Sequence, residues 1–132
     1  MAAIQRVSDI MVRKVVTANT DTSLTEIAKL MRKNRIGSVI IAKNKAPVGI
    51  LTEGDFIRLV ARGCDMKEAS AEEFMNRHVV TCDPSITVVD ALMTMRAERI
   101  RHLPVVKNRK LVGVISIRDL MAATQFSSFY VI

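Results

Sequence analysis

Apolar and polar residues alternate along the chain with two different periods, and the order of these periods predicts the secondary structure. Near the start the apolar positions recur at i, i+3, i+4 and i+7, the spacing of one helix face, and they hold Leu24, Ile27, Ala28 and Met31. Aliphatic runs at Ser38–Lys43 and 48–52, joined by the basic turn KNKAP, predict a β-hairpin. A second helix is predicted at 54–61.

The same order of elements returns in the second half of the chain. The helical spacing is repeated by Val88, Ala91, Leu92 and Met95. Aliphatic runs at 103–107 and 111–116 flank the turn NRK, and a helix is predicted at 118–123. Each half also opens with a helical turn and a brief strand, at 15–16 or 79–80. Polar residues can cap the long helices, namely Thr22 or Ser23 with Glu26, and Thr87 with Asp90.

The two halves are copies of one β-α-β-β-α unit. When Met11 is aligned with Met75, an offset of 64 residues, the alignment runs without a gap over 48 positions, of which 14 are identical. The closing phrase occurs as GILTEGD at 49–55 and as GVISIRD at 113–119. Self-similarity of this kind predicts two structurally equivalent units.

The duplication predicts an α/β (α+β) fold of two tandem units, residues 1–66 and 67–132. A unit of about 60 residues is marginally stable by itself, so we expect the two units to pack sheet to sheet with pseudo-two-fold symmetry. Residues 62–70 are interpreted as a short polar link between the units. The apolar tail 126–132 (FSSFYVI) lies outside the repeat and could pack on a dimer partner or dock on another subunit.

Composition narrows the class of protein. Hydrophobic residues make up 49% of the chain, but it has no Trp, one Tyr and four Phe, which leaves little aromatic surface for stacking on unpaired bases. Cys64 and Cys82 have neither CxxC spacing nor clustered His partners, so neither a metal site nor a disulfide framework is expected. The sequence has no run of about 18 apolar residues and no secretory signal, so we expect a cytoplasmic protein without a membrane span.

The charge balance points to an anionic partner without naming it. The chain carries 20 Lys and Arg against 13 Asp and Glu, a net charge of +7. Bound nucleotides, RNA, DNA or an acidic protein would all fit, and so would a basic surface that maintains solubility. The eight Met residues are interpreted as core filling, and the basic hairpin tips as solvated turns.

The tandem units, the opening xxxMxxxVVT, the stretch RIRHLPVV at 99–106 and the closing phrase G-h-h-[ST]-x-x-D together resemble the CBS domain pair, or Bateman module. The resemblance runs from Ser8 to about Thr124. It implies binding of AMP, ADP, ATP or S-adenosylmethionine in clefts between the units, dimerisation into a disk, and regulation of a partner enzyme or transporter. No effector domain is apparent in the sequence, so a free-standing pair is expected.

The resemblance also implies roles for individual residues. Asp55 and Asp119 would accept hydrogen bonds from ribose hydroxyls, and Thr52 and Ser116 would lie within reach of ribose or phosphate. The helix that begins there suits an anion. Adenine would rest against strand residues, and basic groups would meet phosphates. The residues so implied are Val16, Thr17, Ile36, Gly37, Ser38 and Val39 in the first copy, and Val80, Thr81, Ile100, Arg101, His102, Leu103, Pro104 and Arg118 in the second.

The two copies differ where phosphate would bind. Both keep the Asp and the hydroxyl residue, so both are expected to hold a ribose. The basic residues occur in the second copy alone, where Arg101, His102 and Arg118 stand opposite Gly37, Ser38 and Gly54 of the first. We therefore expect two unequal sites.

Simpler roles are open for the same residues. Asp55 and Asp119 could cap helices, and Gly49 and Gly113 could permit a bend or a close backbone approach. His102 could be a polar residue at a strand edge. The sequence contains no nucleophile with a paired base, no GxxxxGK[ST] loop and no HExxH, so an enzyme is not expected.

The favoured interpretation is a homodimeric sensor of adenosine-containing ligands. The main alternative is a protein- or nucleic-acid-interaction module with idle pockets, which the net charge and the basic hairpin tips support. A structural adaptor that uses the apolar tail is a third possibility.

Overall fold

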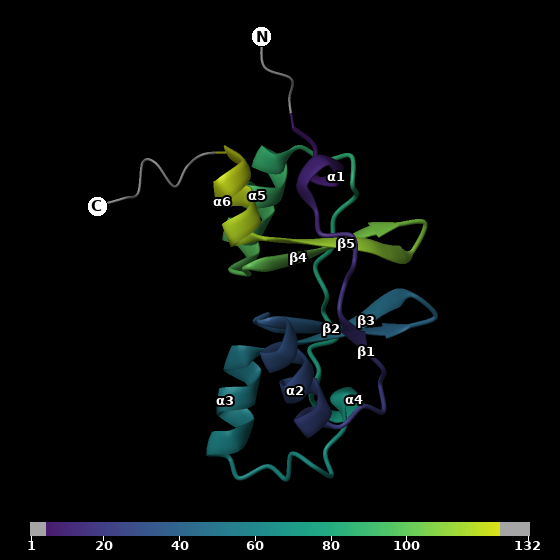
Figure 1. Cartoon of the computed structure of the whole chain (residues 1–132), viewed down its shortest axis with the longest axis vertical. Coiled ribbons are helices and arrows are strands. Elements are labelled where there is room, and N and C mark those ends of the chain that lie inside the picture. Colours follow the sequence, from purple (N-terminus) through teal and green to yellow (C-terminus); the bar gives the residue numbers. More distant parts are fainter. Residues whose placement is uncertain (1–4, 125–132) are drawn as a thin grey trace, which may run out of the picture. The chain divides into compact units, whose positions relative to one another are not determined.

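The structure is a computed structural model that describes residues 5–124 (Figure 1). The tail 126–132 lies outside the described residues. The chain divides into two compact units, one formed by Val16–Val79 and the other by the remaining residues on both sides of that segment. The elements are α1 (Val7–Ile10), β1 (Thr17–Ala18), α2 (Leu24–Asn34), β2 (Ser38–Lys43), β3 (Ala46–Thr52), α3 (Glu53–Ala61), α4 (Ala71–Phe74), α5 (Val88–Glu98), β4 (His102–Lys107), β5 (Lys110–Ser116) and α6 (Ile117–Thr124).

The compact units differ from the sequence repeats because the repeats exchange their opening segments. Helix α1, from the first repeat, lies with the elements of the second (Figure 1). The N–H of Val12 donates to the carbonyl of Val114 (2.9 Å), and the N–H of Val114 donates back (3.0 Å). Reciprocally, Asn76 of the second repeat exchanges backbone hydrogen bonds with Ile50 of the first (3.1 and 3.0 Å). Each unit is therefore completed by the other repeat.

Each unit is built on one hairpin. In the Val16–Val79 unit, β1 pairs parallel with β2, and β2 pairs antiparallel with β3. In the other unit β4 pairs antiparallel with β5. Both hairpins have a register shift at the same place, after Ile41 and after Val105. The turns are two residues long with positive φ, which matches the type I′ hairpin and lets β3 and β5 begin earlier than predicted.

The predicted brief strands were misplaced. In the first repeat the strand is Thr17–Ala18, two residues after the predicted 15–16. In the second repeat, within residues 5–124, only a single bridge forms, between Cys82 and Val105. Pro104 stands where β2 has Ile40, and proline has no N–H to donate to a neighbouring strand. The second ladder is shorter for that reason.

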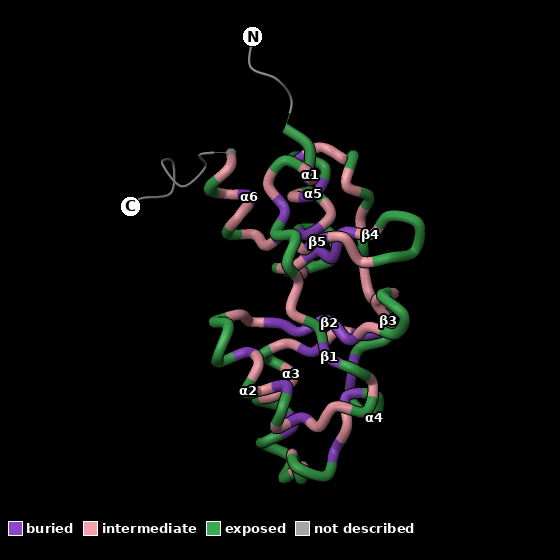
Figure 2. Tube along the Cα trace, turned by 45° about the vertical axis from the view of Figure 1, so that its right-hand side comes forward, coloured by how far each residue is buried: buried purple, intermediate pink, exposed green. Residues whose placement is uncertain are grey.

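The two long helices, α2 and α5, have the predicted faces and caps. Ser23 accepts a hydrogen bond from the N–H of Glu26 (3.2 Å) at the start of α2, and Thr87 accepts one from Asp90 (3.1 Å) at the start of α5. The buried positions, purple in Figure 2, run along the strands of both sheets and the inner helix faces. Among the side chains buried in the two cores are Leu24, Ile27, Met31, Val39, Ile41 and Leu51 in one unit, and Val88, Ala91, Met95, Leu103, Val105, Ile115 and Leu120 in the other.

Candidate functional site

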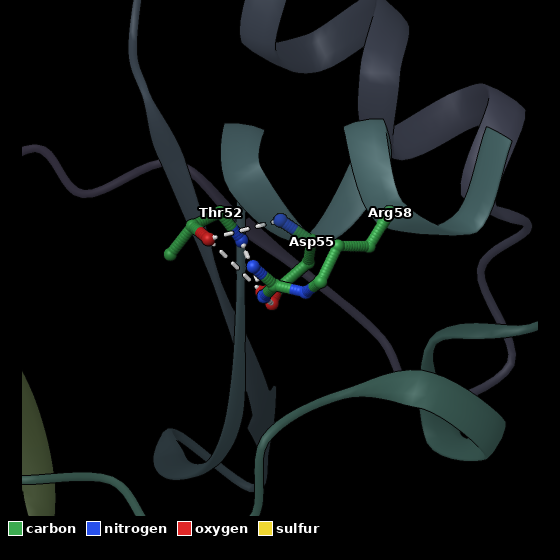
Figure 3. A network of polar contacts seen from close by, with 3 residues as sticks. All are labelled: Thr52, Asp55 and Arg58. Carbon is green, nitrogen blue, oxygen red and sulfur yellow. Dashed lines mark hydrogen bonds and ion pairs between the residues drawn. The ribbon is translucent and has the colours of Figure 1, made fainter. Parts of the chain in front are cut away.

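The closing phrase forms the junction between a strand and a helix. Thr52 ends β3 and is the N-cap of α3, where its Oγ1 accepts the N–H of Asp55 (3.4 Å). The Oδ2 of Asp55 accepts in return from the N–H of Thr52 (2.8 Å) and from its hydroxyl (3.0 Å), as Figure 3 shows. This reciprocal cap satisfies two backbone donors that the helix start would otherwise leave unpaired.

The second copy builds the same junction. Ser116 ends β5 and accepts the N–H of Asp119 through its Oγ (3.1 Å). The Oδ2 of Asp119 accepts the N–H of Ser116 (3.1 Å). The hydroxyl and the carboxylate of each phrase therefore have a structural role, which explains their spacing of three residues without any ligand.

The two carboxylates nevertheless differ in their surroundings. Asp55 forms an ion pair with Arg58, one turn further along α3, through its other oxygen, Oδ1 (Figure 3). The corresponding position in α6 is Ala122. Within residues 5–124 no cation and no hydrogen-bond donor reaches Oδ1 of Asp119. One oxygen of Asp119 can therefore accept a ligand hydroxyl without displacing an ion pair.

The start of each hairpin lies beside this junction. In the first copy the carbonyl of Gly37 accepts the N–H of Glu53 (3.0 Å), and Ser38 pairs with Thr52 across the strands. In the second copy the carbonyl of Arg101 accepts the N–H of Ile117 (2.8 Å), and His102 pairs with Ser116. The structure thus brings together residues that the sequence separates by about 15 positions.

Not every residue implied by the resemblance presents its side chain at this junction. Val39, Leu103 and Pro104 are fully buried, because their side chains pack in the cores. A ligand could reach only the backbone of these three. Ile36 and Ile100 are half-buried and pack against the two cores.

The residues of the predicted first strand adjoin the same hairpins from the other side. Thr17 is exposed and pairs with Ile40 of β2, and Val16 before it is half-buried. In the second copy Thr81 is exposed beside the bridge at Cys82, and Val80 packs partly on the core. In each copy, therefore, one strand of the hairpin ends at the strand–helix junction that contains the Asp. A Val-Thr pair lies next to the other strand.

The three basic residues that the resemblance implies for phosphate all lie on one unit. Arg101, just before β4, and Arg118, in the first turn of α6, are exposed. His102, the first residue of β4, is half-buried. At the equivalent positions the first copy has Gly37, Ser38 and Gly54. The junction at Asp119 consequently has the more positive surroundings, which favours an anionic group there.

Arg58 is the residue near the junction that the sequence reasoning missed. It lies outside the repeated phrase, and the second copy does not preserve it. The signal was nevertheless present, because an Arg three residues after an Asp on one helix is placed to pair with it.

The repeated glycines have a packing role. A Cβ built on Gly49 would lie 2.3 Å from Sδ of Met75, and one built on Gly113 would lie 2.6 Å from Sδ of Met11. Both Met side chains come from the opening segment of the other repeat and are buried. The glycine of the closing phrase and the Met of the opening phrase are thus two halves of one contact.

The cysteines do not form a reactive centre. Both thiols are free and half-buried. Burial, with a further contribution from the neighbouring carboxylate of Asp83, raises the pKa of Cys82 to about 11. At neutral pH this thiol is therefore protonated and a poor nucleophile. Within residues 5–124 no three His, Cys, Asp or Glu side chains are gathered as a metal site would require.

The family model that describes the CBS domain matches the chain twice, at residues 7–62 and 71–125. The chain belongs to the CBS domain family. Its two CBS domains correspond to the two sequence repeats, and the predicted tandem α+β fold is confirmed by solved CBS structures. Among residues 5–124, no helix combines the length and the apolar character needed to span a membrane.

Solved CBS structures are similar over nearly the whole chain. The CBS domain protein PAE2072 from Pyrobaculum aerophilum, complexed with AMP, is 32% identical with a TM-score of 0.83, covering 93% of this chain and 98% of that one. The CBS domain pair of protein MJ0100, in complex with 5′-methylthioadenosine and S-adenosyl-L-methionine, is 28% identical with a TM-score of 0.85, covering 95% and 99%. A hexameric CBS-CP12 protein from bloom-forming cyanobacteria is 27% identical with a TM-score of 0.85, covering 97% and 77%.

Curated relatives include longer proteins. The uncharacterized protein MK0525 from Methanopyrus kandleri is 36% identical over 118 residues, which cover 87% of this chain and 60% of the relative. This chain therefore spans less than two thirds of the length of that relative.

Proposed function

We propose that this CBS pair is a regulatory module that binds an adenosine-containing ligand, with Asp119 as the main ribose acceptor. Similar CBS proteins are complexed with AMP, or with 5′-methylthioadenosine and S-adenosyl-L-methionine. These ligands share a ribose with two neighbouring hydroxyls, and a charged carboxylate oxygen makes strong hydrogen bonds with such donors.

The observation that carries the proposal is the junction at the start of α6. The carboxylate of Asp119 is half-buried and fixed by Ser116, so its orientation is set before a ligand arrives. Fixing a binding group in advance reduces the entropy lost on association. The adjacent basic residues Arg101, His102 and Arg118 would meet the phosphate of a nucleotide or the carboxylate of S-adenosylmethionine.

The first copy is proposed as the weaker site. The Oδ1 of Asp55 is engaged by Arg58, and a ribose would have to displace that guanidinium. Gly37, Ser38 and Gly54 supply no positive charge in the places of the three basic residues. Adenine would contact Val16, Thr17 and Ile36 here, and Val80, Thr81 and Ile100 in the second copy.

Isothermal titration calorimetry with AMP, ATP and S-adenosylmethionine tests the proposal. The variant Asp119→Asn keeps the shape and one acceptor oxygen but removes the charge, and Asp55→Asn is its matched control in the other copy. We expect D119N to weaken the tighter binding event by about 10-fold or more, since a hydrogen bond to a charged group contributes about 1.5–3 kcal/mol. D55N should leave that event unchanged. Absence of heat with all three compounds, or equal binding by wild type and D119N, would overturn the proposal.

Binding would act on assembly or on a partner protein. A ligand can shift a conformational or oligomeric equilibrium only to the extent that it binds one state more tightly. We propose a cytoplasmic homodimer whose state affects a partner enzyme or transporter; the existence of a hexameric CBS-CP12 protein supports assembly as a property of similar chains. Sedimentation velocity with and without AMP measures the effect.

A nucleic-acid-binding role is the second candidate, favoured by the net charge of +7. Counterion release makes such binding fall steeply with salt concentration. Fluorescence anisotropy with a labelled duplex at about 50 and 200 mM salt distinguishes it, because adenosine binding at one shaped site would depend far less on salt.

A further inference from the structure

The first residue of the closing helix differs in charge between the two copies. Helix α3 begins at Glu53 and α6 at Ile117, and the offset of 64 residues aligns these two positions. The N–H of Glu53 donates to the carbonyl of Gly37 (3.0 Å), and the N–H of Ile117 donates to the carbonyl of Arg101 (2.8 Å). Because the two bonds are equivalent, a carboxylate in one copy stands where the other copy has an aliphatic side chain.

Glu53 shares a cavity with a residue that we propose for contact with adenine. Glu53 and Ile36 line one cavity in the first copy, and Ile117 and Ile100 line the equivalent cavity in the second. Two Arg residues also line each cavity at equivalent positions, namely Arg32 and Arg35 in the first copy and Arg96 and Arg99 in the second. Since both copies have them, these Arg residues do not distinguish the two sites.

The junction around Asp55 keeps a negative charge that is not part of an ion pair. Asp55 itself is paired with Arg58. Within residues 5–124 Glu53 forms no ion pair, and the residue is exposed. Glu53 therefore makes the surroundings of the first ribose site negative.

The junction around Asp119 has the opposite balance. Ile117 adds no charge, and the guanidinium groups of Arg101 and Arg118 outnumber the carboxylate of Asp119. The 5′ group of an adenosine is separated from the ribose hydroxyls by one sugar ring, so it stays near the helix start when the Asp binds those hydroxyls. It therefore meets a different sign of charge in each copy.

We propose that the two sites select different adenosine ligands and that Glu53 and Ile117 determine the selection, an inference that rests on the proposed function. The site at Asp119 takes an adenosine with an anionic 5′ group, such as AMP. The site at Asp55 takes an adenosine whose 5′ group is not anionic, such as 5′-methylthioadenosine, because the Glu53 carboxylate repels a phosphate beside it. Both classes of ligand occur in similar CBS proteins, since PAE2072 is complexed with AMP and MJ0100 with 5′-methylthioadenosine.

Isothermal titration calorimetry on single-site variants of the full chain tests the selection. D119N leaves the first site for measurement, and D55N leaves the second. In D119N we expect 5′-methylthioadenosine to bind about threefold to fivefold more tightly than AMP, and in D55N we expect the reverse order. The factor follows from the contribution of one exposed charge, which is up to about 1 kcal/mol, or about fivefold in affinity.

Two substitutions at the helix start assign the effect to the proposed residues. Glu53→Gln in the D119N chain should tighten AMP binding about threefold to fivefold, because it removes the charge and keeps the length of the side chain. Glu68→Gln is the matched control, since it removes an exposed carboxylate outside the junction and should leave AMP binding unchanged. Ile117→Glu in the D55N chain should weaken AMP binding by a similar factor and leave 5′-methylthioadenosine binding unchanged. A purely structural role of Glu53 at the positive end of the α3 dipole would change stability and not the ligand preference.

A second measurement requires no change at the helix start. Raising the salt concentration from about 50 to 200 mM screens exposed charges, so it should weaken AMP binding in D55N and strengthen it in D119N. The same order of ligand affinities in both chains, or equal effects of E53Q and E68Q, would overturn the selection. Adenosine binding without a difference between the sites would leave the proposed function intact, whereas absence of binding by every adenosine ligand would overturn both proposals.

Discussion

A mutation at the contact between Gly49 and Met75 tests directly whether each repeat completes the unit of the other. We predict that Gly49→Ala destabilises the fold. The added Cβ would lie 2.3 Å from Sδ, 2.6 Å from Cγ and 2.9 Å from Cβ of Met75. Attractive contacts between heavy atoms have separations of about 3.5–4.0 Å, so all three atoms must move.

The size of the destabilisation depends on which atoms of Met75 can move away from the new methyl group. The Met75 side chain is flexible, but its own Cβ shifts only with the backbone, and the residue is 7% exposed in a packed core. Overpacking of this kind costs about 1–3 kcal/mol. Replacing a strand glycine by alanine returns about 0.5–1 kcal/mol of backbone entropy, which is the smaller effect. We expect a net loss of about 1–2 kcal/mol in the free energy of unfolding.

Urea unfolding followed by circular dichroism measures the loss, and a double-mutant cycle assigns it. Met75→Ala alone should cost about 2–5 kcal/mol through the cavity it leaves. In the double variant the new methyl group takes up part of that cavity, so the combined cost should fall below the sum by about 0.5–3 kcal/mol.

Gly54→Ala is the matched control. Gly54 lies in α3, and a Cβ there would have its nearest neighbours at 3.6 and 3.8 Å. This variant should be neutral or more stable by up to about 1 kcal/mol. If G49A behaves like G54A, or if the cycle is additive, Met75 does not pack on Gly49 and the described exchange of segments is refuted.

Three further predictions concern the junctions and the buried thiol. Arg58→Ala should strengthen adenosine binding at the first copy by no more than about fivefold, because exposed ion pairs contribute up to about 1 kcal/mol. Weaker binding in calorimetry would instead show that Arg58 contacts the ligand. Ser116→Ala should cost about 1 kcal/mol in urea unfolding through loss of the α6 cap, and no loss would contradict the capping role. In a Cys64→Ser background at pH 8, iodoacetamide should modify Cys82 about 100-fold more slowly in the folded chain than in urea, because burial raises its pKa to about 11 in the folded chain. Equal rates would show an exposed thiol.

The sequence was sufficient for features that depend on local spacing. The helix faces through Leu24 and Val88 and the caps at Ser23 and Thr87 follow from periods of three and four residues, and the structure confirms them. The duplication added the equivalence of the two closing phrases. A strand of two residues has no measurable period, so β1 was misplaced at 15–16.

The exchange of opening segments could not be predicted from the sequence, for a different reason. It depends on which hairpin a chain segment meets after a turn, and both repeats carry the same Met, so the sequence is compatible with either pairing. The structure decides it, through the contacts of Met11 with Gly113 and of Met75 with Gly49 and through the backbone hydrogen bonds beside them. The ribose role of the two Asp residues stays a prediction, because their caps account for the same pattern.

The exchange has a consequence for fragments of almost equal length. Residues 16–79 contain β1 to β3, α2 to α4 and the Met75 contact, and so form one whole unit. Residues 1–66 follow the sequence repeat but lack α4 and Met75 and leave the Ile50 edge of β3 without Asn76. We predict that the 16–79 fragment unfolds cooperatively in urea, although a domain of this size is marginal, and that the 1–66 fragment does not.

Two-dimensional nuclear magnetic resonance spectra of both fragments provide the readout, since dispersed amide signals require fixed packing. Adding a peptide that covers 71–79 to the 1–66 fragment should recover dispersion, because the peptide supplies the missing Met and the strand-edge hydrogen bonds. A peptide with Met75→Ala is the control and should be less effective. A well-dispersed spectrum for 1–66 without any peptide would mean that each repeat folds by itself, and the exchange would then be a feature of packing with no part in stability.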